Sequence, residues 1–220
     1  MNRLRVVPAL AALLLLAAWP ASAQYQDWTN YRPSSTLFTI GWQMAQPIGS
    51  LHDYTPSASF RGFTMDWRSL IAKSASLGLR FNWNRFNSTF DNLVQTTTTA
   101  GGSTGGTLSG PVFRYADQFV LEGIAHYYFG MGDSIVLPYA GVGLGGVWSS
   151  SYQQTADLVN SQSGFYFIVS PEVGLTITLA KGSTNAGLNL AVMYNFTTAS
   201  FRNVSNAQNI AETVALTFGY

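Results

Sequence analysis

The 220-residue chain contains no cysteine and only two lysines. Without cysteine, neither a disulfide framework nor a cysteine-ligated metal site can form. Charged residues make up 10% of the sequence, well below the roughly 25% typical of soluble domains. The few basic residues are not clustered as a phosphate backbone would require, so nucleic acid is not an expected partner.

Long apolar runs are also missing from most of the chain. After residue 23, no uninterrupted apolar stretch reaches the roughly 18 residues that indicate a membrane-spanning helix. Aromatic residues nevertheless make up 14% of the sequence. A chain that is poor in charge and rich in aromatics needs some way to avoid aggregation. A closed β-barrel in lipid is one, because all its backbone polar groups are paired between strands.

The beginning of the chain has the features of a secretory signal peptide. Arg3 and Arg5 precede an apolar segment, Val6–Trp19, and small residues at Ala21–Ala23 form a cleavage site. The sequence therefore predicts export and a mature chain that starts after Ala23. Cleavage there removes two arginines and leaves 9 basic against 10 acidic side chains.

Most of the mature sequence alternates between large apolar residues and small or polar ones. Period-two alternation predicts strands with one apolar face. Eight such strands are expected, at 36–46, 59–67, 75–86, 115–129, 135–148, 164–179, 187–197 and 210–220.

The composition of the second face distinguishes a membrane barrel from a soluble β-protein, which is the alternative. A soluble sheet usually carries many Lys and Glu residues on its water-facing side. Here that face is mostly Gly, Ala, Ser, Thr and Asn, while Lys73 and Lys181 fall in predicted turns. Small residues suit a narrow barrel interior, and Trp and Tyr near strand ends suit interfacial girdles. The predicted fold is all-β: an eight-stranded antiparallel up-and-down transmembrane β-barrel.

The connections are expected to alternate between short periplasmic turns and longer outer loops. The short turns fall at 68–74, 130–134 and 181–185, and the outer loops at 47–58, 87–114, 149–163 and 200–209. The loop at 87–114 contains a Thr- and Gly-rich stretch of low complexity. It is therefore the expected site of contact with an extracellular ligand.

The last predicted strand has a distinctive pattern. Val214, Leu216, Phe218 and Tyr220 lie on one face, with small residues between them. This pattern resembles the closing strand of bacterial outer-membrane β-barrels. In those proteins the terminal aromatic residue and its alternating partners are the signal read by the barrel-assembly machinery, so the resemblance implies the same role for these four residues.

Together with the signal peptide, the segments Ser59–Phe63, Leu137–Gly145 and Leu216–Tyr220 resemble the small eight-stranded outer-membrane barrels. That group holds the OmpA transmembrane domain, OmpX and the OmpW-like proteins. The resemblance implies a monomer embedded in the outer-membrane lipid of a Gram-negative bacterium. The expected organisation is a signal peptide at 1–23, a periplasmic lead-in at 24–35 and the barrel at 36–220.

The interior of an eight-stranded barrel is just wide enough for side chains to fill. Counting from the predicted turns places Arg80, Glu122 and Glu172 at similar heights in that interior. We expect them to form an ion-pair network that plugs the lumen, because an unpaired charge away from water is costly. The expected role is structural or surface-interactive, without a wide pore. The alternative is an OmpW-like narrow channel for small apolar solutes, which would need an apolar lumen.

Catalysis is not expected, although enzymes exist on this scaffold. His126 lies near the predicted periplasmic end of its strand, on the wrong side for chemistry on outer-leaflet lipid. His52 and Asp53 fall in the first outer loop near Ser50 and Ser57, but such a pair is more often a solvated surface pair. The sequence has no phosphate loop, no HExxH motif and no metal-ligand cluster. No catalytic, cofactor-binding or metal-binding residue is therefore predicted.

Overall fold

The structure, a computed structural model, describes residues 36–72, 74–98, 104–129, 135–155, 158–180, 185–202 and 204–219. The predicted signal peptide at 1–23, the lead-in at 24–35 and Tyr220 lie outside these residues.

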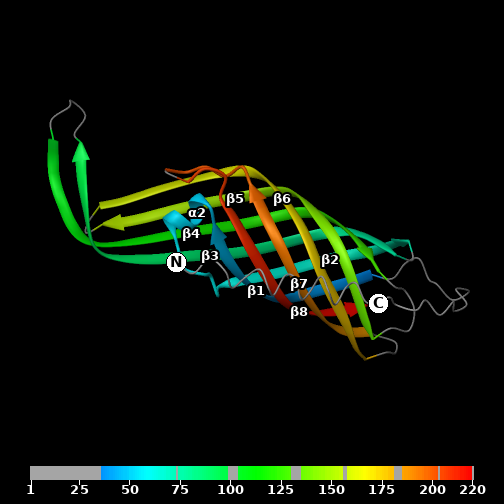
Figure 1. The fold of residues 1–220 in the computed structure, drawn as a ribbon. Coiled ribbons are helices and arrows are strands. Elements are labelled where there is room, and N and C mark those ends of the chain that lie inside the picture. Colours follow the sequence, from blue (N-terminus) through cyan, green and yellow to red (C-terminus); the bar gives the residue numbers. More distant parts are fainter. Residues whose placement is uncertain are drawn as a thin grey trace, which may run out of the picture.

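The described chain forms a closed barrel in which each strand pairs antiparallel with its neighbours in the sequence (Figure 1). The predicted all-β, eight-stranded up-and-down barrel is therefore confirmed. Its strands are β1 (Thr36–Ile48), β2 (Gly62–Ala72), β3 (Ala75–Thr98), β4 (Thr104–Tyr128), β5 (Val136–Thr155), β6 (Leu158–Ala180), β7 (Asn185–Thr197) and β8 (Gln208–Gly219).

The two faces of the barrel wall have the composition that the alternation predicts. In β1, Thr39 and Gln43 are buried in the interior, whereas Trp42, which lies between them on the other face, is 45% exposed. In β6, Phe165 and Phe167 are exposed, and Ser170 is fully buried. Large apolar side chains thus cover the outside, and small or polar side chains fill much of the inside.

Two of the predicted outer loops are strands instead. The segment expected as a loop at 87–114 continues the β3–β4 ladder from Asn87–Tyr115 to Thr98–Thr104. The segment at 149–163 continues the β5–β6 ladder in the same way, as far as Thr155–Leu158. The low-complexity composition suggested a loop, but its threonines are β-branched and suit a paired strand.

These extensions make one side of the barrel wall much taller than the other. In Figure 1, β3, β4, β5 and β6 continue well beyond the level at which the other strands end. The pairing of β2 with β3 stops at Gly62–Asn84, and the pairing of β6 with β7 stops at Ile168–Thr197. We call the part of β3–β6 beyond these pairs the tall wall.

The predicted first outer loop contains a short helix, α2 (Ser50–Tyr54). Leu51 and Tyr54 are buried and join one apolar cluster with Phe201 and Val204, which precede β8. These side chains form an apolar cap over the barrel mouth. None of the helices in the described part of the chain is long and apolar enough to cross a membrane.

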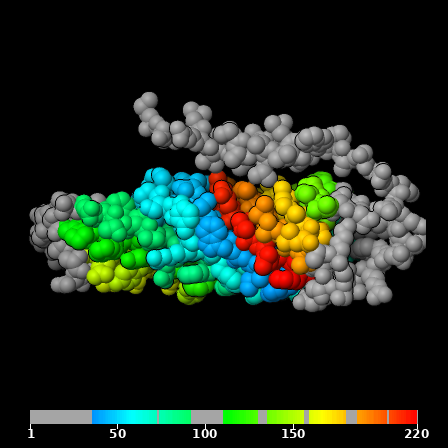
Figure 2. All heavy atoms as spheres, turned by 90° about the horizontal axis from the view of Figure 1, so that it is seen from below, coloured from blue at the N-terminus to red at the C-terminus, as the bar shows by residue number. Residues whose placement is uncertain are grey.

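The barrel closes where β8 lies against β1, seen in Figure 2 as red beside blue. Gly41 of β1 lies opposite Ala215 of β8 at this seam. A Cβ atom on Gly41 would overlap both the side chain and the backbone of Ala215. The seam therefore depends on the absence of a side chain at this position.

A Gly41→Ala substitution should lower the free energy of unfolding by about 1–3 kcal/mol, the usual cost of overpacking. The measurement is the urea midpoint at which the folded, unboiled gel form disappears. Gly110→Ala is the matched control, because a Cβ atom at Gly110 would meet nothing within 4 Å. Equal midpoints for the two variants would contradict close packing at the seam.

Candidate functional site

The middle of the lumen holds a cluster of buried charges. The structure brings together Arg80 of β3, Glu122 of β4 and Glu172 of β6, the three residues selected from the sequence, and each is at most 4% exposed. Arg80 Nη2 lies 2.6 Å from Glu172 Oε1, and Arg80 Nη1 lies 3.8 Å from Glu122 Oε2. Arg80 and Glu122 are direct cross-strand partners, so the sheet register itself sets their proximity.

His126 of β4 joins this cluster. Its Nε2 atom is paired with Glu172, and its Nδ1 atom lies 2.9 Å from Arg68 Nη1. Arg80 Nη2 also lies 3.3 Å from Nε2. Because a guanidinium can only donate hydrogen bonds, the imidazole is placed between two cationic donors and the Glu172 carboxylate.

Arg68 forms a second centre of the cluster. Its Nε atom lies 2.7 Å from Asp66 Oδ1. Its other nitrogens donate to Thr39 Oγ1 at 2.7 Å and to Tyr128 Oη at 3.1 Å. Glu122 also accepts a hydrogen bond from the Ser170 hydroxyl. Two guanidiniums therefore face three carboxylates.

Aromatic rings lie on one side of the charged cluster. The ring of Tyr139 stacks on His126 with centroids 4.9 Å apart, and Tyr128 lies 5.8 Å from Tyr139. Tyr139 donates its hydroxyl to Asn189 Oδ1 at 3.1 Å. Because Gly141 faces His126 and a Cβ atom there would overlap the ring, the glycine of β5 makes room for the imidazole.

Sequence reasoning missed Met193, which projects into the lumen from β7. Its sulfur lies 3.6 Å from Arg80 Nη1 and 3.9 Å from Gln43 Nε2. The alternation in β7 does place Met193 on the interior face, between Ala191 and Asn195. Its long apolar side chain did not match the small or polar residues expected there, so it was not assigned to the interior.

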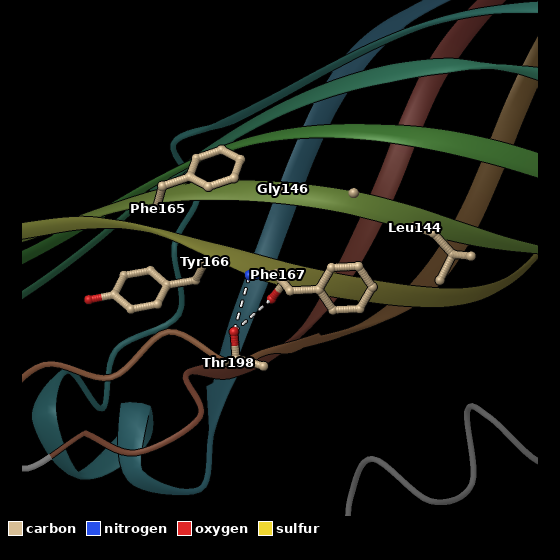
Figure 3. Close-up of a pocket in the computed structure, with 7 residues that line it drawn as sticks. Leu144, Gly146, Phe165, Tyr166, Phe167 and Thr198 are labelled. Carbon is tan, nitrogen blue, oxygen red and sulfur yellow. Dashed lines mark hydrogen bonds between the residues drawn. The ribbon is translucent and has the colours of Figure 1, made fainter.

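A second feature is a groove on the outside of the barrel, where β7 diverges from β6 (Figure 3). Thr198 hydrogen-bonds to Phe167 there, through backbone and side-chain atoms. The groove is lined by Leu144, Gly145, Gly146, Phe165, Tyr166, Phe167 and Thr198. It is mainly apolar, because Leu144, Phe165 and Phe167 contribute large exposed surfaces.

The remaining residues selected from the sequence lie at the surface, except Tyr220, which is outside the described residues. Val214 and Leu216 face outward from β8 and are 46% and 47% exposed, and Phe218 lies on the same face. Their role as an assembly signal stays a prediction. His52 and Asp53 are exposed on α2. Among the described residues, no three His, Asp or Glu side chains are grouped to hold a metal ion.

Comparisons with known proteins show the fold alone. No protein-family model matches the sequence, and no curated protein matches it. The structure is similar to crystal structures of Ail, the attachment invasion locus protein of Yersinia pestis. One is a complex with the heparin analogue sucrose octasulfate. Its Ail chain is 9% identical in sequence to this chain, and the structural alignment covers 86% of this chain and 100% of the Ail chain with a TM-score of 0.51. The other is 8% identical with the same coverage and TM-score.

Replacing Arg80 by Met should lower the free energy of unfolding by about 3–5 kcal/mol, because it leaves buried carboxylates without their cation. The measurement is the urea unfolding midpoint of the purified protein in detergent. Arg85→Met is the matched control. Arg85 pairs with Asp117 at 2.7 Å on the outer surface, and its side chain is 42% exposed, so its loss should cost roughly 0–1 kcal/mol.

An unchanged midpoint for Arg80→Met would show that the buried ion pairs do not stabilise the barrel. A loss of the same size in Arg85→Met would point to a general effect of removing arginine instead.

Proposed function

We propose that this protein is a monomeric, integral barrel of a Gram-negative outer membrane, with a structural or surface-interaction role and no catalytic activity. The observation that carries the proposal is the apolar outer face. On β2 to β5, Trp67, Leu79, Leu121 and Leu144 are all more than half exposed. The outer face continues on β1 and β8, where Trp42 and Leu216 are 45% and 47% exposed. Such a continuous apolar surface is an aggregation hazard in water but suits contact with lipid.

The upper limit of this apolar surface is marked by aromatic and charged residues. Trp83 stacks on Phe119 with centroids 6.2 Å apart. Two residues further along each of these strands, Arg85 and Asp117 form an outward ion pair. Aromatic residues followed by charges are typical of the interface between hydrocarbon and water. The tall wall begins at this level, so it would stand outside the membrane.

The tall wall supports a role in contact with external molecules. Its strands present both a broad face and two edges, whereas the opposite side of the barrel ends low. Ail, which shares the fold, is named for attachment, and one of its structures holds a heparin analogue. We therefore propose that the protein binds ligands outside the cell through the tall wall.

The contents of the lumen favour a plugged barrel over a wide pore. The apolar cap, the charged cluster and the tyrosine pair fill successive levels of the interior. The alternative, an OmpW-like narrow channel for small apolar solutes, would need an apolar path through the lumen. Arg68, Arg80 and their carboxylates oppose that path, because bringing an apolar solute past buried charges is unfavourable.

The chain has no cysteine, so single introduced cysteines can report its orientation. Asn160→Cys on the tall wall should react in intact cells with a maleimide that does not cross membranes. Ile71→Cys, at the other end of the barrel and also on an exposed side chain, is the matched control. It should react only after the outer membrane is permeabilised. The reverse pattern would invert the orientation, and recovery of the protein in the soluble fraction would overturn the proposal.

In planar bilayers, the purified protein should give no stable conductance steps, because its lumen is filled at several levels. A Leu51→Ala/Phe201→Ala variant, which opens only the apolar cap, should also stay closed, since the charged cluster remains. Regular steps in the unaltered protein would contradict the plug. Uptake of a hydrophobic solute by vesicles that contain the protein, absent from empty vesicles, would favour the narrow channel.

A further inference from the structure

Two arginines lie beside Gln153, a residue on the inner face of the tall wall. Arg114 belongs to β4 and is the cross-strand partner of Gln153 in β5. Arg202 lies between β7 and β8, and its Nη1 atom donates to Gln153 Oε1 at 2.7 Å. Gln153 is therefore a shared neighbour of two arginines from distant parts of the sequence.

These arginines differ from the other charged groups of the lumen, because the described residues give them no carboxylate partner. Arg68 and Arg80 are each within ion-pair distance of an acid, whereas Arg114 and Arg202 are not. Arg114 donates to the backbone oxygen of Tyr54 at 3.3 Å, and its Nε atom is buried without an acceptor. Burial lowers the pKa of Arg114; Tyr54 opposes this shift in part, and the charge of Arg202 adds to it.

The site is preorganised by its surroundings. The guanidinium of Arg114 lies 5.1 Å from the ring centre of Tyr54 and 4.7 Å from that of Phe90, so two aromatic rings hold it by cation–π contacts. Tyr54 is itself fixed against Phe201, with ring centroids 5.5 Å apart. Arg202 adopts a φ of 50°, a left-handed backbone that is unfavourable for a residue with a side chain.

We propose that Arg114 and Arg202 form a binding site for a phosphate or sulfate group carried on a ligand outside the cell. A tetrahedral oxyanion can accept hydrogen bonds from two guanidiniums at once. It would also offset the repulsion between the two cations. Arg202 is exposed, so the site opens to solvent. The inference rests on the proposed function, which places the tall wall outside the membrane.

The test measures binding of glucose 6-phosphate and glucose 6-sulfate to the full-length protein in detergent, by titration calorimetry at low salt. Arg114→Gln and Arg202→Gln should each weaken binding at least tenfold. Arg61→Gln is the matched control, since Arg61 is an exposed arginine ahead of β2 and should have no effect. Added salt should weaken binding to the unaltered protein, because the attraction is electrostatic.

All variants must keep the heat-dependent gel mobility of the folded barrel, so that a lost fold is not mistaken for a lost site. Binding that is equal in the unaltered protein, Arg114→Gln and Arg202→Gln would overturn the inference. So would the absence of binding to either probe at millimolar concentration. A protein that passes the cysteine-labelling test yet binds neither probe would leave the proposed function standing and remove only this site.

Two further arms identify where the oxyanion comes from. One uses phosphatidylcholine vesicles that contain lipopolysaccharide or its dephosphorylated form, and the other uses dextran sulfate against plain dextran. An arginine-dependent preference for the phosphorylated lipid would assign the site to the cell's own surface. An arginine-dependent preference for the sulfated polymer would assign it to a foreign glycan.

Discussion

Closure of the sheet between β1 and β8 is the constraint on which the rest of the structure depends. Their ladder runs from Leu37–Gly219 to Ile48–Gln208 and leaves no free edge in the lower barrel. Backbone polar groups there are paired without water, as a lipid environment requires. Closing eight strands also fixes a narrow diameter, so the interior must be packed by side chains. This explains why Gly41 and Ala215 meet at the seam, where larger residues would hold the strands apart.

Because the barrel is narrow, its charges are held away from water and must satisfy one another. Arg80 lies between Glu122 and Glu172, and Arg68 lies between Asp66 and His126. The apolar cap lies at one end of this cluster and the tyrosine pair near the other. Both reduce access of water, which strengthens each ion pair and also raises the cost of losing one partner. In the proposed plugged barrel, the charged cluster and the apolar cap would close the lumen together.

The sequence was sufficient for the strands, their two faces and the three central charges, because period-two alternation and register follow directly from residue order. It was insufficient for features that depend on height or on distant contacts. The Arg68–His126 bond joins β2 to β4 across the lumen, and alternation alone does not specify such a pair. The apolar cap was not predicted either, because Leu51 and Tyr54 occur in a segment whose sequence is typical of a loop. The tall wall was missed because its Thr- and Gly-rich composition suits a flexible loop as well as a hydrated hairpin.

The tall wall also limits where the membrane can lie, by an argument independent of side-chain polarity. Above Asn84, the ladder between β2 and β3 has ended. Only Arg85 is still bonded on this side, from its N to Arg61 O at 3.1 Å and to its O from Ser59 Oγ at 2.6 Å, as far as the described residues show. Backbone groups on such an edge need water, because an unpaired peptide group in hydrocarbon costs several kcal/mol. In the proposed membrane placement, the hydrocarbon would therefore end near this point of β3. The outward Arg85–Asp117 ion pair begins at the next residue, so backbone pairing and side-chain charge place the boundary at the same level.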